Sequence, residues 1–247
     1  MRAVRFHDEA RLELDHEVGY NAAVTPMLGE PGYLRLRRMT VPRSNENEVN
    51  NHPTNDVIYE TVVTTLSADG TPHVAPMGVR YRGDEVVLMP FKPSATHDNI
   101  VATGVAVLNL VTDTRVFAGC VTGRRAWPVQ PALHIPGVRL DCALRHVELR
   151  LARQDGDAQR PVMHMARVHA ATHAEFIGFN RAQAAVVEGA VLVSRLHMLA
   201  PEKVDAEMAY LQIAIDKTAS AQEHEAWGWL TDAVQQHRVL IAKKAQA

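Results

Sequence analysis

Hydrophobic and β-branched positions from Ile58 to Met89 predict three consecutive β-strands. Residues 58–65, IYETVVTT, combine β-branched and aromatic side chains that suit a pleated sheet better than a helix. The pair Asp69-Gly70 then indicates a hairpin turn, because glycine accepts a positive φ without steric cost. Residues 73–81 form the returning strand, and Gly83-Asp84 turns the chain into a third strand over residues 85–89. Such a meander is typical of a small barrel or a sandwich.

The second predicted strand is interrupted at Ala75-Pro76-Met77-Gly78. Proline cannot donate a hydrogen bond to a neighbouring strand, and glycine offers no side chain to pack. The interruption therefore marks a strand edge, a bulge, or a place where a ligand lies against bare backbone. The sequence leaves these three interpretations open.

A short helix is predicted between residues 90 and 104, PFKPSATHDNIVATG, with Thr96 as the expected N-cap. Lys92, Ser94 and Thr96 place a cation and two hydroxyls at the start of this helix. A helix N-terminus suits a phosphate, because its free N–H groups and its dipole both favour an anion. The alternative is that Ser94 and Thr96 only cap the helix and that Lys92 only faces water.

The next strand is predicted over residues 105–113, VAVLNLVTD, with Asn109 as a polar residue among apolar ones. A buried amide needs hydrogen-bond partners, so either the backbone or a bound ligand must supply them.

Two further strands are predicted over residues 138–152 and 160–171, after a short helix at residues 114–119 and a long loop over residues 123–137. In that loop, Arg124, Arg125 and Trp127 either cover a planar ligand or serve a loop or subunit contact. The strand count reaches six, which suits a small closed antiparallel barrel.

From Asn180 onward the pattern becomes helical, with predicted helices over residues 180–199, from Pro201, and over residues 221–242. Asn180 and Arg181 stand at the first helix start, where they favour contacts with an anion or a carbonyl group. Alternatively, Asn180 only caps the helix and Arg181 faces solvent.

Composition narrows the class of protein. Of 247 residues, 47% are hydrophobic and 22% are charged, and the net charge is −2, as in an ordinary globular protein. This balance disfavours nucleic acid and anionic membrane surfaces as partners. Two cysteines without CxxC spacing suggest free thiols in a reducing compartment. No apolar run has the length of a membrane span and no signal peptide is evident, so we expect a cytoplasmic protein.

Two other segments have weaker signals. Residues 1–56 form an expected N-terminal extension that ends in a polar, flexible linker from Val41 to Asp56, and its Arg35–Arg38 stretch is interpreted as solvated rather than as a nucleic-acid arm. His164, His169 and His173 have no familiar ligand spacing on a strand, so we predict no metal site.

Five motifs in order resemble the domain-of-unknown-function 447 family, whose members are flavin-mononucleotide-binding split-barrel proteins of methanogens and methylotrophic bacteria. The motifs are YETVVTT, HVAPMGVR, PFKPSATHDNI, AVLNLVTD and GFNRAQAAVVEGAVL. The resemblance runs from about Ile58 to the C-terminal region. Residues 1–56 depart from it.

The resemblance implies an α+β protein: a six-stranded antiparallel split β-barrel over residues 57–175, followed by a C-terminal helical unit over residues 176–247. It implies non-covalently bound FMN, with the phosphate at the Lys92–Asn99 segment and the ring along Met77–Val79 and near Asn109. It also implies a homodimer with flavin at the subunit boundary. The residues expected to contact FMN are Met77, Gly78, Val79, Phe91, Lys92, Ser94, Thr96, Asn99, Asn109, Thr112, Asp113, Asn180 and Arg181.

Two functions of different classes follow. The first is an FMN-dependent oxidoreductase, similar to a flavin reductase, of one-carbon or pterin-linked metabolism; that setting comes only from where the resembling family occurs. The second is a non-enzymatic module that binds or senses flavin. No residue stands out as a general acid or base, and no GxGxxG follows a strand, so a nicotinamide donor would bind only transiently.

Overall fold

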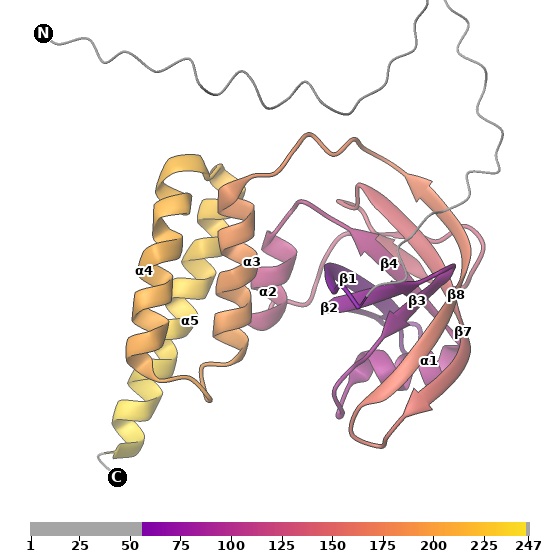
Figure 1. Cartoon of the computed structure of the whole chain (residues 1–247), viewed down its shortest axis with the longest axis horizontal. Helices are drawn as coiled ribbons and strands as arrows, with labels where there is room; N and C mark the ends of the chain where they lie inside the picture. The colour runs from indigo at the N-terminus through magenta and orange to yellow at the C-terminus, as the bar shows by residue number, and fades with distance from the viewer. Residues whose placement is uncertain (1–55, 246–247) are drawn as a thin grey trace, which may run out of the picture. The chain divides into compact units, whose positions relative to one another are not determined.

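The structure, a computed structural model, describes residues 56–245. The predicted N-terminal extension, apart from its last residue, lies outside the described residues, and so does the Arg35–Arg38 stretch. The described part comprises a β-barrel followed by a helical unit (Figure 1).

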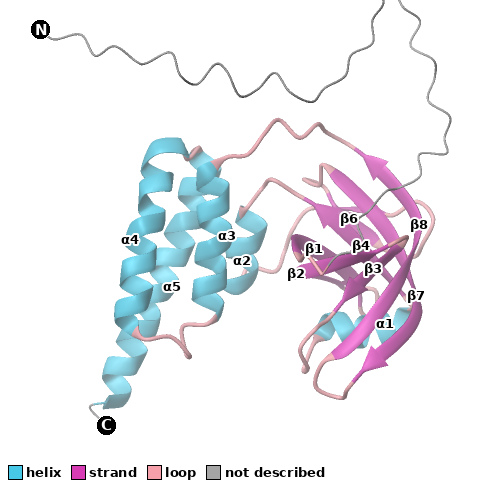
Figure 2. Cartoon of the chain, in the orientation of Figure 1, coloured by secondary structure: helices cyan, strands magenta, loops and turns pink. Residues whose placement is uncertain are grey.

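Six antiparallel strands close into the barrel in the order β1-β2-β3-β8-β7-β4. They are β1 (Tyr59–Leu66), β2 (Pro72–Arg82), β3 (Glu85–Leu88), β4 (Val105–Leu110), β7 (Arg145–Gly156) and β8 (Pro161–Thr172). The sequence-based prediction of a six-stranded antiparallel barrel with C-terminal helices is confirmed (Figure 2).

Alternating side chains from these strands fill the barrel interior, and helix α1 (Ala95–Thr103) adds Ile100, which is fully buried among them. Helix α1 ends as predicted at Gly104, whose φ of 73° is left-handed. Its N-cap, however, is Ser94 and not Thr96. Ser94 has extended backbone angles and its side chain accepts the N–H of His97 at 3.2 Å, whereas Thr96 already lies in the first turn.

The segment between β4 and β7 differs from the prediction. Strand β4 ends at Leu110, and helix α2 (Arg115–Val121) follows shortly afterwards. The predicted loop 123–137 contains a strand, β5 (Val129–Pro131), which pairs with β6 (Val138–Leu140). The predicted strand 138–152 is therefore two strands, because residues 138–140 pair with β5 outside the barrel and only the chain from Arg145 joins it.

We call residues 129–140, the β5–β6 hairpin, the strap. Three buried polar side chains on the outer barrel wall hold it. Thr64 of β1 donates to the carbonyl of Val138, and Asn109 of β4 accepts the N–H of Leu140 at 2.8 Å. The Glu148 carboxylate of β7 accepts the N–H groups of Leu133 at 2.7 Å and His134 at 2.8 Å. Backbone groups of the strap that would lose water on burial are thus paired.

Histidines surround the Glu148 carboxylate. His146 Nε2 lies 3.3 Å from Glu148 Oε1, and His146 Nδ1 lies 2.8 Å from His173 Nε2. His134 and His169 lie next to them, with ring centroids 4.3 Å apart and ring planes tilted by 48°. Uncharged His146 satisfies both of its contacts by donating from one nitrogen and accepting at the other.

Three helices form the C-terminal unit: α3 (Arg181–Ser194), α4 (Pro201–Thr218) and α5 (Ala221–Ala245). Helix α3 ends earlier than predicted, so that Leu196 and Leu199 lie in the connection to α4. Within the described residues, no helix has the length and apolarity that crossing a membrane requires.

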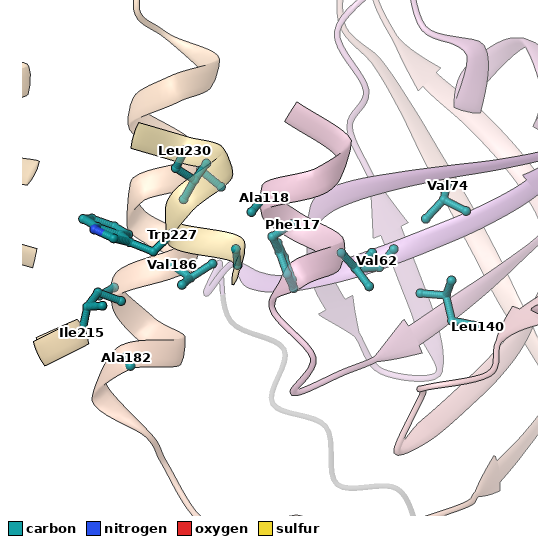
Figure 3. Packing of buried hydrophobic residues seen from close by; sticks show 14 of the residues in the cluster. Val62, Val74, Phe117, Ala118, Leu140, Ala182, Val186, Ile215, Trp227 and Leu230 are labelled. Atoms are coloured by element: carbon teal, nitrogen blue, oxygen red, sulfur yellow. The ribbon is translucent and has the colours of Figure 1, made fainter. Parts of the chain in front are cut away.

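Helix α2 joins the barrel to the helical unit. Its Phe117 packs between Val62 on the barrel wall and Val186 of α3, within one continuous apolar cluster (Figure 3). Gly189 of α3 lets Trp227 of α5 approach closely, because a Cβ there would lie 2.8 Å from Trp227 Cζ3 and 3.1 Å from Leu230 Cδ1.

We expect Gly189→Ala to lower the free energy of unfolding by about 1–3 kcal/mol, because the added methyl group overpacks the contact between α3 and α5. Urea unfolding followed by circular dichroism measures the change. Gly228→Ala in α5 is the matched control, because no atom lies within 4 Å of the position that its Cβ would take. Alanine is more favourable than glycine inside a helix, so this substitution should raise the free energy of unfolding by about 0.5–1 kcal/mol. Equal effects of the two substitutions would contradict the packing assigned to Gly189.

The histidines at the strap predict an acid-sensitive fold. Burial, opposed by Glu148, lowers the pKa of His146 from 6.5. Below about pH 6.5, His146 is therefore protonated in the unfolded chain but not in the folded protein. The free energy of unfolding falls with falling pH until the pH passes the pKa of folded His146.

We expect His146→Gln to reduce this loss, which for one proton is at most about 1.4 kcal/mol per pH unit. Unfolding free energies measured between about pH 7.5 and about pH 5.5 test it. A residual slope should remain, because burial also lowers the pKa values of His73 and His173. The control is His224→Gln, an exposed position on α5. An unchanged slope in His146→Gln would refute the role given to this residue.

Candidate functional site

Strands β2 and β3 part after a short common stretch. They pair only from Val79 opposite Leu88 to Arg82 opposite Glu85. Beyond Val79, residues 72–78 of β2 pair with β1 alone. Pro76 lies in this stretch, so the interpretation of its segment as a strand edge is confirmed.

On the other side, the chain leaves β3 after Leu88 and runs through residues 89–94 into α1. We call the two diverging segments, residues 72–78 and residues 89–95, the β2–β3 split. Met77 and Gly78 thus belong to one side of the split, and Phe91, Lys92 and Ser94 belong to the other. The two sides come from two separate sequence motifs, and they diverge at the paired residues Val79 and Leu88. Helix α1 also packs against β2. Two groups of predicted flavin contacts are therefore brought near each other.

On the β2 side, the split offers mainly backbone. The side chain of Val79 is fully buried in the barrel interior. The carbonyl of Met77 accepts a hydrogen bond from Thr61 Oγ1 at 2.8 Å. The face of Gly78 is covered by Ile58, whose Cγ2 lies 2.6 Å from where a Cβ would stand; Ile58 itself is 51% exposed.

On the α1 side, the first turn of the helix is polar. Ser94 satisfies only the N–H of His97, which leaves the N–H groups of Ala95 and Thr96, the first two of the helix, without a capping side chain among the described residues. Asn99 is held by Thr65 of β1, to whose Oγ1 it donates at 2.9 Å. Thr96 and Asn99 are buried, so both are fixed by packing.

Phe91 and Lys92 project at the same place. Phe91 is 67% exposed and lies under the Arg160 guanidinium, which is 4.5 Å from the ring centroid. Lys92 is exposed, and its N–H donates to the carbonyl of Gln159 at 3.1 Å. The β7–β8 turn therefore braces the segment that carries the lysine.

His97 is a residue of this site that the sequence interpretation missed. It is 5% exposed, its Nδ1 lies 2.9 Å from Asp98 Oδ1, and its Nε2 is buried with no hydrogen-bond partner in the described part of the chain. A buried nitrogen without a partner is costly, by about 1–3 kcal/mol. Its position in the first turn, between residues predicted to contact the phosphate, was the available signal.

Asn109 lies elsewhere, under the strap. Its Nδ2 is 3.2 Å from each of the Val62 carbonyl, Thr64 Oγ1 and the Val107 carbonyl, and its Oδ1 accepts the Leu140 N–H. Of the two sources of partners that the sequence left open, protein groups supply them here.

Thr112 and Asp113 follow β4 and line two different cavities, of about 570 and 370 Å³ respectively. Asp113 is engaged by Arg115, with contacts of 2.9 Å to Nε and 2.7 Å to Nη2. The ion pair fixes the start of α2.

Asn180 caps α3. Its Oδ1 accepts the N–H groups of Ala182 at 2.8 Å and Gln183 at 3.2 Å, while its Nδ2 donates to the Thr218 carbonyl at 3.0 Å. Arg181 is exposed. The geometry matches the capping alternative for Asn180, and it ties α3 to the end of α4.

Arg124 and Trp127 contact other parts of the same chain. The Arg124 guanidinium lies 4.1 Å from the ring centroid of Trp229, and Trp127 packs against Gly119. Burial raises the pKa of Cys120 to about 11, so this thiol is protonated near neutral pH and is not a ready nucleophile. Residues 56–245 contain no cluster of three or more side chains arranged to hold a metal ion.

Comparison with known proteins places the chain. The family model for the N-terminal domain of DUF447, a protein of unknown function, matches residues 59–174, and the model for its C-terminal part matches residues 180–232. A crystal structure of an FMN-bound protein of the same family, from Methanosarcina mazei, is similar with a TM-score of 0.62 and 20% identity. That similarity covers 73% of this chain and 96% of the other.

More distant structures share about half of the chain. The styrene monooxygenase flavin reductase of Pseudomonas putida has 12% identity and a TM-score of 0.39, covering 47% of this chain and 80% of its own. Flavoredoxin of Desulfovibrio vulgaris has 12% identity and a TM-score of 0.40, covering 52% and 77%. No curated protein matches the sequence.

The two family models together cover the barrel, the connection and most of the helical unit, in the chain order that the five motifs indicated. The chain belongs to the DUF447 family.

Proposed function

We propose that this protein binds FMN non-covalently at the β2–β3 split and acts as a flavin-dependent oxidoreductase similar to a flavin reductase. The single observation that carries the proposal is the first turn of α1. Free N–H groups, the Lys92 cation and the unpartnered Nε2 of His97 are all contributed there by a few consecutive residues.

The residues present fit a phosphorylated ligand. Two N–H groups at the positive end of α1 suit a phosphate, which accepts several hydrogen bonds and carries negative charge. Lys92, on the exposed segment before the helix, adds a compensating cation. Among residues 56–245, His97 Nε2 has no hydrogen-bond partner, and such a ligand can provide one. The family relative from Methanosarcina mazei holds FMN, which supports the choice of nucleotide.

The unpaired edge of β2 suits the ring. Among the described residues, residues 72–78 have a partner strand on one side only, so some of their backbone groups face away from β1, where a flat polar heterocycle can meet them. Met77 and Gly78 lie in this stretch, and Gly78 adds no side chain to the strand edge. We expect Phe91 to cover the ring from the other side of the split, since it is exposed and aromatic.

Bound FMN would supply the electron or hydride transfer, and the protein would hold and orient it. Ser94 fixes the helix start, Thr65 fixes Asn99, and Ile100 anchors α1 in the barrel core, so the phosphate site is built on a rigid element. In this proposal Asn109, Asp113 and Asn180 do not contact FMN directly. They hold the strap, the start of α2 and the start of α3 respectively.

The proposal has three further parts. We expect a homodimer, and the connection after β8 supports it, because Phe176, Ile177 and Phe179 are 54%, 96% and 99% exposed. A cytoplasmic location accords with two unpaired cysteines. The metabolic setting, one-carbon or pterin-linked, rests on the occurrence of the family.

We expect Lys92→Ala to weaken FMN affinity by about tenfold or more, the cost of one charge-assisted contact, while leaving unfolding of the FMN-free protein unchanged. Fluorescence titration with FMN and thermal unfolding without it make the two measurements. Ser94→Ala should instead impair both, because Ser94 also caps α1, at a cost of about 1 kcal/mol.

Lys243→Ala, at an exposed position on α5, is the matched control and should change neither quantity. If Lys92→Ala bound FMN as tightly as the wild type, the assignment of the phosphate to the start of α1 would be wrong.

An anaerobic donor screen separates the enzyme from a non-enzymatic flavin-binding module. We expect bound FMN to be bleached within seconds by NADH, NADPH or a reduced deazaflavin and to be reoxidised by an added acceptor, as followed by absorbance. Reduction no faster than that of free FMN with every donor would favour the binding module.

A further inference from the structure

The helical unit contains a cavity that the proposed function does not use. Helix α5 has 25 residues and α3 has 14, so α5 continues past the end of α3 (Figure 1). The α3–α4 connection, residues 195–200, folds beside this part of α5. A cavity of about 310 Å³ lies between the connection, the first turn of α4 and α5.

One part of its wall is aliphatic. Leu196 and Leu199 come from the connection, Val204 from α4, and Val234 and Ile241 from α5. Val204 and Val234 are 2% and 7% exposed, so this part of the wall is buried. Ile241 is 48% exposed and stands at the rim. The wall suits an apolar body, since burial of apolar surface is favourable.

The rest of the wall is basic. His197, His237 and Arg238 line it. The Nε2 of His237 is buried and has no hydrogen-bond partner among residues 56–245. Arg238 pairs with Asp205, and its side chain remains 42% exposed. A guanidinium has five N–H donors, so one carboxylate leaves several of them available.

Nearby carboxylates balance the cations next to this wall, so an anion would be recognised by available hydrogen-bond donors and not by net charge. Arg238 is partly balanced by Asp205, and the adjoining cavity, which shares Leu196, His197 and His237, adds Arg124 and Asp232. The Arg124 guanidinium stacks on Trp229 and forms no ion pair with a carboxylate in the described part of the chain. The orphan N of His237 can donate to an oxygen that enters beside it.

We propose that this cavity binds a small amphipathic carboxylate, with its aliphatic body against the leucine and valine wall and its carboxylate against His237 and Arg238. At about 30 Å³ per water-sized group, the volume accommodates roughly ten non-hydrogen atoms. The site is separate from the β2–β3 split, so its test is independent of flavin binding.

Isothermal titration of the full-length protein with octanoate, which has about ten non-hydrogen atoms, tests the proposal. Octan-1-ol and acetate serve as comparisons, because each retains only the body or only the charge. We expect octanoate to bind at least about tenfold more tightly than octan-1-ol, since a hydrogen bond to a charged group contributes about 1.5–3 kcal/mol, and acetate to show no uptake.

His237→Leu and Arg238→Gln should each weaken octanoate binding about tenfold while FMN affinity stays unchanged. Their matched controls are His224→Leu on α5 and Arg195→Gln beside the cavity, neither of which lines it. Leu199→Trp, which fills the cavity from the connection, should abolish binding, and circular dichroism verifies that each variant is folded.

Absence of octanoate uptake by the folded wild-type protein overturns the proposal, whether the cavity is then empty or covered by another part of the chain or a second copy. Uptake that is equal in wild type, His237→Leu and Leu199→Trp overturns it as well, because the ligand would then bind elsewhere.

Discussion

The unequal length of two neighbouring strands determines where this barrel presents its candidate site. Strand β2 has 11 residues and β3 has 4, so β2 outruns its partner and keeps an unpaired edge. The physical cause lies just after β3: Pro90 and Pro93 lack N–H groups and cannot continue the ladder. The chain therefore turns away from the sheet into α1, whose Ile100 packs inside the barrel. An open edge and a helix N-terminus arise together from this one mismatch.

Buried polar groups play a second organising role, on the outer wall. Thr64, Asn109 and Glu148 come from three different strands, and each makes at least one hydrogen bond to backbone of the strap. A buried carboxylate is tolerable only when it is paired in this way, and two N–H donors plus His146 pair Glu148. The strap is consequently held against the outside of the barrel. The polar residues beneath it have a structural role, although their residue types are also found in catalytic sites.

The helical unit is attached through small residues and one aromatic anchor. Ala182, Ala185, Gly189 and Ala190 line the buried face of α3, which brings α5 and its Trp227 close. Helix α2 then connects this cluster to Val62 on the barrel. Because the contacts are apolar and continuous, the helical unit packs on the outer wall of the barrel through one cluster, which is separate from the cluster inside the barrel. The longer α5 leaves a hollow where α3 has ended, and the proposed carboxylate site occupies that hollow.

Much of the fold could be predicted because its signals are local. β-branched runs, Asp-Gly and Gly-Asp turns, Gly104 at a helix end and Pro201 at a helix start each act within a few residues of their own position, so the sequence by itself determined six barrel strands and three terminal helices. It also determined the family, through motifs whose order is a property of the chain. The proposed phosphate-binding role of the Lys92–Asn99 segment rests on signals that are local in the same sense, and it was predicted together with its capping alternative.

Tertiary structure alone decided how polar residues are used. Asn109 and Asn180 were equally compatible with a ligand and with backbone partners, and their partners, Leu140 and Thr218, are 31 and 38 residues away in the chain. The break between Leu140 and Arg145 was invisible for the same reason, since pairing with β5 rather than with the barrel has no local signature. The unpartnered nitrogens of His97 and His237 likewise become apparent only once packing has removed water from them. Hydrogen-bond satisfaction in a buried environment depends on groups brought together from distant parts of the chain, and only the folded molecule specifies them.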